Sequence, residues 1–445
     1  MRACGCGARL RVGVLGLPLL LGACGFGWWG EADAPPLPGE RQPVLLLEAG
    51  PEPDPALAGA PVVLPPVRNN DAWPQIGGDA THTLLHVALE PPLRRAWTAD
   101  VGRGNSATSR LIGAPVVDGG LVFAADANAT VAAFRLENGQ RVWRRSFRLG
   151  TDRRLGAGLA AQGGGVFVAT SAGEVAGLDA ANGEIIWSTE LGSPVRAAPT
   201  LVGRTVLVTT ADNQTFALDA VTGATLWAHQ AFAEVSAILG GASPASAGGA
   251  VIAPYSSGEV FGLVLENGAP VWIDSVRRPV RTAAIAAISD IRAAPVIDPA
   301  GRVIVAGHGG EVAAIDIPSG QRLWDQRLTS AETPWVTTDS VFLVTTQGEV
   351  VALDSETGRI RWVTQLQRFR RGDDPDSGRI TYTGPVLASG RLWVIGSNGE
   401  LTALAPATGA VIDTTPIATG VTLAPAIARG TLIVLDDRGR LHAYR

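Results

Sequence analysis

Short apolar runs alternate with polar residues along most of the chain, and glycine, asparagine or aspartate separates one run from the next. Within the third repeat this pattern predicts four strands, at 198–202, 205–210, 214–219 and 224–228, joined by tight turns. Apolar residues do not recur at the 3.6-residue spacing of amphipathic helices. The pattern therefore predicts an all-β protein built from units of four short strands.

The four-stranded unit is repeated along the chain. The tract ALDAVTGATLW at 217–227 recurs as ALDSETGRIRW at 352–362, and weaker copies follow one another at intervals of 38 to 52 residues. Repeats of this length that consist of strands are typical of β-propeller blades. The copies end at Trp143, Trp187, Trp227, Trp272, Trp324, Trp362 and, where the tryptophan is replaced, Asp413.

Both ends of the repeat array indicate a closed ring. The last unit, 424–445, contains three strands, and the strand that it lacks is predicted at 93–98, ahead of the first complete unit. Pairing these two segments removes the open sheet edges at the ends of the array. We therefore predict an eight-bladed β-propeller with four-stranded blades over residues 73–445, closed by an N-terminal strand added to the C-terminal blade.

Composition agrees with a turn-rich β protein and narrows the range of partners. The chain is 46% hydrophobic and only 17% charged, and it contains 55 Gly and 30 Pro, as expected of many short strands joined by turns. The formal net charge is −5. Bulk charge therefore does not favour binding to nucleic acid.

The N-terminus has the features of a secretory leader. Three arginines precede the apolar run 12–21, which is too short to span a bilayer. The run ends in Leu21-Gly22-Ala23-Cys24, which resembles a bacterial lipobox and predicts a lipoprotein signal peptide at 1–23 with Cys24 lipidated. The alternative is an ordinary signal peptide that happens to contain a cysteine. The other two cysteines lie in the leader, so no disulfide is expected within the mature chain.

A lipidated Cys24 would anchor the protein to a membrane without crossing it. Gly25 rather than Asp follows the cysteine, which in enterobacterial lipoproteins favours passage to the outer membrane. Residues 24–72 are rich in proline and show no convincing strand period. Together these features predict a lipidated cysteine followed by a Pro-rich tether that carries the propeller.

The repeated motif Ala-x-Asp-x-x-Thr-Gly-x-x-x-Trp resembles the tryptophan-docking motif of quinoprotein-type (PQQ-like) propellers. The resemblance implies that the glycine lies in the turn between the third and fourth strands and that the tryptophan packs between neighbouring blades. A buried tryptophan removes about 150–250 Å² from water, so we expect a structural Trp girdle. Its members are Trp97, Trp143, Trp187, Trp227, Trp272, Trp324 and Trp362.

Enzymes with this motif bind pyrroloquinoline quinone and calcium at the centre of the ring, commonly above a disulfide between adjacent cysteines. The predicted propeller contains no cysteine, and its recurrent aspartates lie in the blade motif, where they suit turns. We therefore expect no catalytic residue and no cofactor. A quinoprotein-like PQQ-dependent dehydrogenase or a periplasmic ligand sensor stays as the alternative. The recurrent aspartates are Asp179, Asp219, Asp316 and Asp354.

Two groups of residues deserve comparison with metal sites. His82 and His86 have an i, i+4 spacing but no accompanying Glu in an H-E-x-x-H pattern, and the acidic loop 373–376 lacks the Gly and terminal Glu of a calcium loop. We expect both groups to be solvated surface and predict no metal site.

The combination of lipobox, eight blades and missing enzyme residues resembles the BamB family, which are lipoprotein propellers of the outer-membrane β-barrel assembly machinery. The resemblance implies a non-enzymatic scaffold, lipid-anchored at the periplasmic face of the outer membrane, that supports folding and insertion of β-barrel proteins. Its implied partners are the periplasmic POTRA domains of the barrel-inserting outer-membrane protein and companion lipoproteins. Unfolded β-barrel clients are a further candidate.

In that family the partner contact uses two adjacent loops, which correspond here to 236–240 and 290–292. The resemblance implies partner-binding roles at these positions, although Leu239 and Arg292 depart from the family pattern and rearrange its charges. The alternative for both loops is an ordinary connection between blades. The implied partner-binding residues are Ile238, Leu239, Gly240, Asp290 and Arg292.

The connections from the fourth strand of one blade to the first strand of the next are unequal in length. The segments 273–292 and 363–383 are long, whereas 325–332 is short. Such connections all emerge on one face of a propeller, and binding residues are frequent on loops that a rigid scaffold carries. The lengths therefore predict a docking surface on that face.

Overall fold

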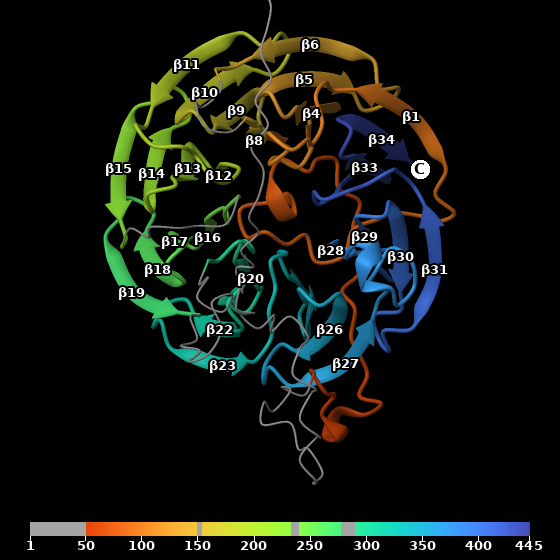
Figure 1. The fold of residues 1–445 in the computed structure, drawn as a ribbon. Helices are drawn as coiled ribbons and strands as arrows, with labels where there is room; N and C mark the ends of the chain where they lie inside the picture. The colour runs from red at the N-terminus through yellow and green to blue at the C-terminus, as the bar shows by residue number, and fades with distance from the viewer. Residues whose placement is uncertain (1–49, 149–153, 233–239, 277–289) are drawn as a thin grey trace, which may run out of the picture. The chain divides into compact units, whose positions relative to one another are not determined.

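The computed structural model describes residues 50–148, 154–232, 240–276 and 290–445. Within the unit Gly50–Arg445, eight antiparallel sheets of four strands each surround a common centre, as Figure 1 shows. The predicted all-β, eight-bladed propeller is confirmed. No helix among the described residues is long and apolar enough to cross a membrane.

We number the blades in chain order. Blade 1 contains β3 (Val116–Asp118), β4 (Leu121–Ala125), β5 (Thr130–Arg135) and β6 (Arg141–Ser146), and blade 2 contains β8 (Ala157–Gln162), β9 (Gly165–Thr170), β10 (Glu174–Asp179) and β11 (Ile185–Glu190). Blade 3 contains β12 (Thr200–Val202), β13 (Thr205–Thr209), β14 (Gln214–Asp219) and β15 (Thr225–Gln230), and blade 4 contains β16 (Ala245–Ala247), β17 (Ala250–Pro254), β18 (Glu259–Val264) and β19 (Pro270–Ser275).

The remaining blades follow the same order. Blade 5 contains β20 (Val296–Ile297), β21 (Arg302–Ala306), β22 (Val312–Asp316) and β23 (Arg322–Gln326), and blade 6 contains β24 (Trp335–Val336), β25 (Ser340–Val344), β26 (Glu349–Asp354) and β27 (Ile360–Gln365). Blade 7 contains β28 (Tyr382–Ala388), β29 (Arg391–Gly396), β30 (Glu400–Leu404) and β31 (Val411–Pro416), and blade 8 contains β32 (Ala426–Ala428), β33 (Thr431–Leu435), β34 (Arg440–Tyr444) and β1 (Arg95–Asp100). Outside the blades lie the parallel pair β2 (Ser109–Arg110) and β7 (Arg154–Leu155) and the short 3-10 helices η1 (Pro55–Leu57), η2 (Ile76–Gly78) and η4 (Pro375–Ser377).

The two ends of the propeller meet in blade 8. Strand β1 pairs antiparallel with β34, with Trp97 opposite Ala443. Arg94 and Arg445 exchange backbone N–H···O bonds of 2.7 and 3.0 Å next to this pair. The outermost strand of the last blade therefore comes from the N-terminal side of the propeller.

Burial follows the position of a strand within its blade. In β4 and β5 nearly every residue is buried, because both faces of these strands pack against neighbouring blades. In the outer strand β6 a single residue, Trp143, is buried. The apolar cores therefore lie between blades, and the fourth strands form the outer wall.

Each girdle tryptophan joins its own blade to the next one. Trp227, for example, donates its indole N–H to the carbonyl oxygen of Leu265, at 2.8 Å. Its ring packs on Gly268, which has a φ of +70° and where a Cβ would lie 2.4 Å from the ring. The carbonyl acceptors of the seven tryptophans are those of Leu136, Ala180, Ala220, Leu265, Ile317, Ser355 and Pro406.

Residues 50–72, the described part of the predicted tether, contact the propeller. The N–H of Asp54 donates to the carbonyl of Ile360 in β27, at 2.8 Å, and Arg361 donates to the carbonyl of Pro61 at 3.2 Å. The N–H of Val63 donates to the Asp339 carboxylate at 2.7 Å. A free coil would make no such bonds, so contact with the ring begins before the predicted boundary at residue 73.

Residues 70–89, here called the inner clasp, run around the inside of the ring and include η2 at its centre (Figure 1). This segment makes a hydrogen bond to the first strand of every blade, or to a residue next to it, in chain order from blade 8 through blades 1 to 7. The bonds join Asn70 to Ile427, Trp73 to Val117, Pro74 to Ala161, Gln75 to Leu201, Ala80 to Ser246, Thr81 to Ile297, Thr83 to Val336 and Val87 to Leu387.

Candidate functional site

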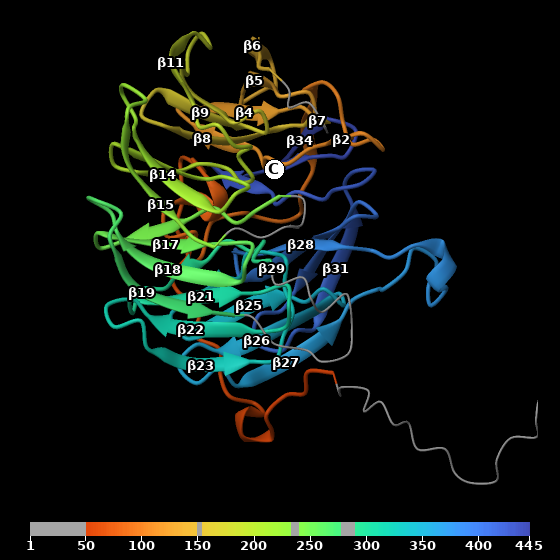
Figure 2. The ribbon, with the colours of Figure 1, turned by 60° about the vertical axis from the view of Figure 1, so that its left-hand side comes forward.

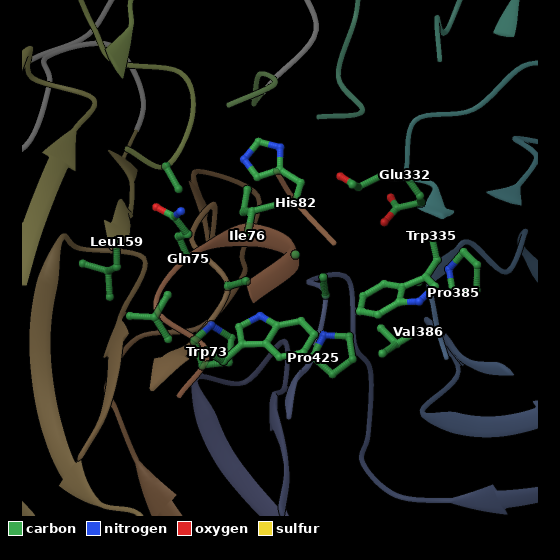
Figure 3. Close-up of a pocket in the computed structure, with 18 residues that line it drawn as sticks. Trp73, Gln75, Ile76, His82, Leu159, Glu332, Trp335, Pro385, Val386 and Pro425 are labelled. Atoms are coloured by element: carbon green, nitrogen blue, oxygen red, sulfur yellow. The ribbon is translucent and has the colours of Figure 1, made fainter. Parts of the chain in front are cut away.

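The centre of the ring is largely filled by the inner clasp. Beside the clasp lies a cavity of about 60 Å³, lined by clasp residues and by the starts of the innermost strands. Trp73 of the clasp and Trp335 of β24 stack within it, with ring centroids 6.0 Å apart and planes at 16° (Figure 3). Pro115, Pro385 and Pro425, which occupy equivalent positions in three blades, add to its apolar wall.

Two titratable groups line this cavity. His82 is fully buried, its Nδ1 bonds the carbonyl oxygen of Pro295 at 2.8 Å, and its Nε2 has no hydrogen-bond partner among the described residues. Burial lowers the pKa of His82. Burial also raises the pKa of the Glu332 carboxyl to about 7, against the opposing effect of the Arg292 charge. Both groups are therefore held in their neutral forms more readily than in water.

The cavity is too small for a multi-ring quinone, because sites for ligands of that size have volumes of about 300–1,000 Å³. Among the residues that the structure describes, no group of three or more His, Cys, Asp or Glu side chains is placed to hold a metal ion. The recurrent aspartates serve turns instead. Asp219 accepts bonds from the N–H groups of Val221 and Thr222, and the bond from Thr222 is the largest cause that lowers its pKa.

The expectation that His82 and His86 are solvated surface residues is wrong. His82 is buried at the centre of the ring, and His86 is 4% exposed. His86 accepts the N–H of Gly390 on Nε2, at 2.8 Å, and its Nδ1 lies 2.6 Å from the carbonyl oxygen of Pro65. Both imidazoles tie the N-terminal segment to the ring, a role that their spacing in the sequence does not reveal. Asp373 and Asp376 are exposed, in agreement with the prediction for the acidic loop.

The structure brings together three of the five implied partner-binding residues. Arg196, which precedes β12, donates to the carbonyl oxygen of Gly240 at 2.8 Å and forms an ion pair with Asp290 at 2.6 Å. Both side chains of this pair are buried, with exposed fractions of 10% for Arg196 and 1% for Asp290. Arg292 lies beside Gly240, because a Cβ on that glycine would be 3.7 Å from its Nε. Ile238 and Leu239 lie outside the described residues.

Arg196 is a residue that the motif comparison missed. It occupies the same place in its blade as Arg292, since both precede Ala-Ala-Pro at the start of a first strand. Aligning the repeats by this proline would have indicated that two arginines face the same end of the channel. His308 adjoins them, with its N–H bonded to the carbonyl of Asp290 at 3.2 Å. Burial, and then the Arg292 charge, lower the pKa of His308.

An eight-bladed ring with tryptophan docking between its blades defines a protein of the quinoprotein-type propeller class. Solved structures share this fold. BamB from Moraxella catarrhalis superposes with a TM-score of 0.67 at 22% identity, covering 79% of this chain and 99% of that chain. Quinohemoprotein alcohol dehydrogenase from Comamonas testosteroni superposes with a TM-score of 0.66 at 15% identity, covering 84% of this chain and 80% of that chain. At these identities the structures show the fold alone.

Sequence comparison identifies the family. The family model described as outer membrane protein assembly factor BamB matches residues 92–154 and 130–364. The BamB of Alkalilimnicola ehrlichii is 36% identical over 351 residues, which cover 78% of this chain and 87% of that protein. The chain belongs to the BamB family. In the alignments with the BamB proteins of Moranella endobia and Salmonella typhimurium, at 26% and 28% identity, the chain spans half of the length of each relative.

Proposed function

We propose that this protein is a non-enzymatic scaffold subunit of the outer-membrane β-barrel assembly machinery, which supports folding and insertion of β-barrel proteins through protein–protein contacts. The observation that carries the proposal is the family match over residues 92–364, together with relatives named as outer membrane protein assembly factors. The rigid ring is the scaffold, and its loops supply the contacts.

The centre of the ring supports a role without catalysis. The inner clasp and the stacked tryptophans occupy the place where a large ligand would sit, and the recurrent aspartates are engaged in turns. The alternative of a PQQ-dependent dehydrogenase or ligand sensor predicts that the purified protein takes up the quinone in the presence of calcium. Titration of the full-length protein with both, followed by absorbance of the protein fraction, tests this alternative directly.

We place the protein at the periplasmic face of the outer membrane, held by lipid on Cys24. The lipobox and Gly25 support this location. Labelling with a radioactive fatty acid tests the anchor, with Cys24→Ala as the variant that should lose the label. Recovery of labelled protein in the outer-membrane fraction is the expected result, and label retained by Cys24→Ala would contradict it.

The partner surface is the face that carries the connections between blades. Arg196 holds the backbone at Gly240 and the side chain of Asp290 at one point, so the two loops present a single surface. We assign Ile238, Leu239, Gly240, Asp290 and Arg292 to this surface, and we name the POTRA domains of the barrel-inserting protein as the partner. We expect companion lipoproteins of the machinery to be part of the complex that this protein forms with the barrel-inserting protein.

The experiment that tests the function is recovery of the tagged, full-length lipoprotein from its own membranes in mild detergent, followed by mass spectrometry. The expected companions are the barrel-inserting outer-membrane protein and other lipoproteins. Recovery of the propeller alone, or with respiratory electron carriers, would contradict the proposal.

Leu239→Asp tests the loop assignment within the same experiment. It should lower partner recovery by at least tenfold, as for a residue at the centre of an interface, and should leave the fold intact. Leu226→Asp is the matched control, because Leu226 is 53% exposed on the outer strand β15, away from these loops. Equal recovery with both variants would reject the loop assignment.

A further inference from the structure

A charged hairpin projects from the ring between blades 6 and 7. We call residues 368–380 the arm; they form most of the connection between β27 and β28 (Figure 2). The corresponding connection between blades 5 and 6 joins β23 to β24 with only eight residues, 327–334. A connection of about eight residues would therefore suffice to join blades 6 and 7, and the additional length needs another explanation.

The arm has a defined conformation that comes from its own hydrogen bonds. Phe369 and Arg379 form an antiparallel bridge, flanked by bonds from the N–H of Arg370 to Gly378 and from the N–H of Ile380 to Arg368, at 3.0 and 2.9 Å. At the tip, the Asp374 side chain caps η4 by accepting the N–H of Asp376 at 3.0 Å. A segment that is ordered before it binds loses less conformational entropy on association.

Charge is divided along the arm. Arginines lie in its stem and aspartates at its tip, in a protein whose net charge is −5. Arg379 bonds the Gln347 side chain and Arg370 bonds the carbonyl of Ser397, so these two arginines fix the stem to blades 6 and 7. Arg368 and Arg371 are exposed, and Arg371, 76% exposed, forms an ion pair with Asp374 at 3.1 Å. Such exposed pairs contribute little to stability, so both cations are available to a partner.

The arm lies on the same face as the loops that contain Gly240 and Asp290, because all three segments connect a fourth strand to the next first strand. It also lies beyond residue 364, where the match to the family model ends. The arm therefore extends the same face of the ring as the two loops.

We propose that the arm is a second docking element, which places the exposed arginines of its stem against an acidic patch on the folded protein that the loops bind. This proposal rests on the proposed function, because it concerns the same partner. Charge favours a protein over an anionic membrane. A lipid surface would meet the tip first, and Asp373 and Asp376 at the tip are exposed and would be repelled. A protein surface can carry different charges at different places, and can therefore be complementary both to the cationic stem and to the acidic tip.

The test compares three full-length proteins in mild detergent for binding to the full-length barrel-inserting protein of the same organism. The wild type is compared with R368E/R371E and with the matched control R135E/R141E. The control reverses two exposed arginines at the turn between β5 and β6, on the opposite face. We expect R368E/R371E to bind about tenfold more weakly at low salt, mostly through slower association, and we expect the difference to shrink at high salt. R368Q/R371Q should show a smaller loss in the same direction.

The outcomes separate this inference from the proposed function. If the wild type binds and R368E/R371E binds equally well, the arm is not a docking element, while the scaffold function stands. If the wild type fails to bind, the proposed function fails and the inference falls with it. Flotation of the wild-type and R368E/R371E proteins, each carrying Cys24→Ala so that no lipid anchor contributes, with vesicles of phosphatidylethanolamine and phosphatidylglycerol is the second measurement. Vesicle binding that R368E/R371E abolishes, with unchanged protein binding, would show that the arm recognises lipid and would overturn the proposal.

Discussion

Each girdle tryptophan acts as a link between two blades, because its indole N–H and its ring face both contact the turn of the following blade. The one missing tryptophan supports this interpretation. Asp413 replaces it in β31 of blade 7, and the blade that follows is blade 8. There the third and fourth strands belong to opposite ends of the propeller, so no glycine turn exists for a tryptophan to dock on. The tryptophan of blade 7 and the glycine turn of blade 8 that would receive it are therefore both absent.

Removing one girdle tryptophan should weaken the ring. Trp227→Ala should lower the free energy of unfolding by about 3–5 kcal/mol, since it removes a buried indole and leaves the carbonyl of Leu265 without its donor. The exposed neighbour provides the control, and Leu226→Ala should change stability by no more than about 0.5 kcal/mol. Urea unfolding of the two variants measures the difference. Equal values would mean that the girdle has no structural role.

The buried Arg196–Asp290 pair should matter for both stability and partner binding. Arg196→Ala removes the 2.6 Å ion pair to the buried Asp290 carboxylate, and should cost about 3–5 kcal/mol. It should also lower partner recovery, because the Gly240 loop loses the same guanidinium. Thermal unfolding and pull-down of Arg196→Ala, with Arg196→Lys as the conservative variant, test both effects. If Arg196→Ala is destabilised but recovers the partner at the wild-type level, the ion pair contributes to stability and not to partner binding.

Glu332 should give the ring a pH-dependent stability. Burial raises its pKa from 4.5 to about 7, so the folded state holds a proton that the unfolded state releases between these values. This contribution to stability is fully present below pH 4.5 and is lost as the pH rises through 7, by on the order of 1–3 kcal/mol. Glu332→Gln should remove that slope, which urea unfolding at several pH values would detect. An unchanged slope would show that other groups cause it.

At the scale of elements, the inner clasp is the segment that contacts every blade. Propeller blades otherwise contact only their neighbours, and stability in such arrays is close to a sum of local terms. The clasp adds contacts that connect blades which are not neighbours. Trp73, for example, bonds blade 1, and Val87 of the same segment bonds blade 7. It also fills the channel, with Gln75 only 3% exposed and hydrogen-bonded to Leu201. The clasp therefore acts as a common core for the ring.

A protein that begins at residue 90, and so retains β1, should fold into a less stable ring. The innermost strands β3, β12, β16 and β24 should exchange their amide hydrogens faster, since each loses its contact with the clasp. Hydrogen exchange of the truncated and full-length proteins measures this, and the outer strand β15 serves as the internal control. Equal protection of the inner strands in both proteins would show that the clasp only fills space.

At the scale of the whole molecule, the ring separates two functions between its parts. The packed sheets and the clasp supply rigidity, whereas the connections between blades carry the arm and the loops at Gly240 and Asp290. Closure by β1 holds the N-terminal and C-terminal sides of the propeller at one blade. Residues of the proposed docking face lie in these connections, so they can change without altering the strands of the blades.

The number of blades and the positions of their strands follow from the repeats in the sequence. In blade 3 the four predicted strands agree with β12 to β15 within two residues at each end. The strand predicted at 93–98 is β1, Arg95–Asp100. It could be predicted because it carries the tryptophan of the repeated motif. These features are encoded locally, by alternation within a strand, by glycine in the turns and by repetition of both.

The contacts at the centre of the ring and at the proposed docking face depend on the tertiary structure. Residues 70–89 carry no repeat and little strand pattern, since their backbone groups bond to segments far away in sequence. The burial of His82 and His86 cannot be predicted from the sequence for this reason. Arg196 and Asp290 are 94 residues apart, and their meeting depends on how consecutive blades turn around the ring axis. Local pattern specifies each blade, but contacts between distant segments are defined only when all eight blades close.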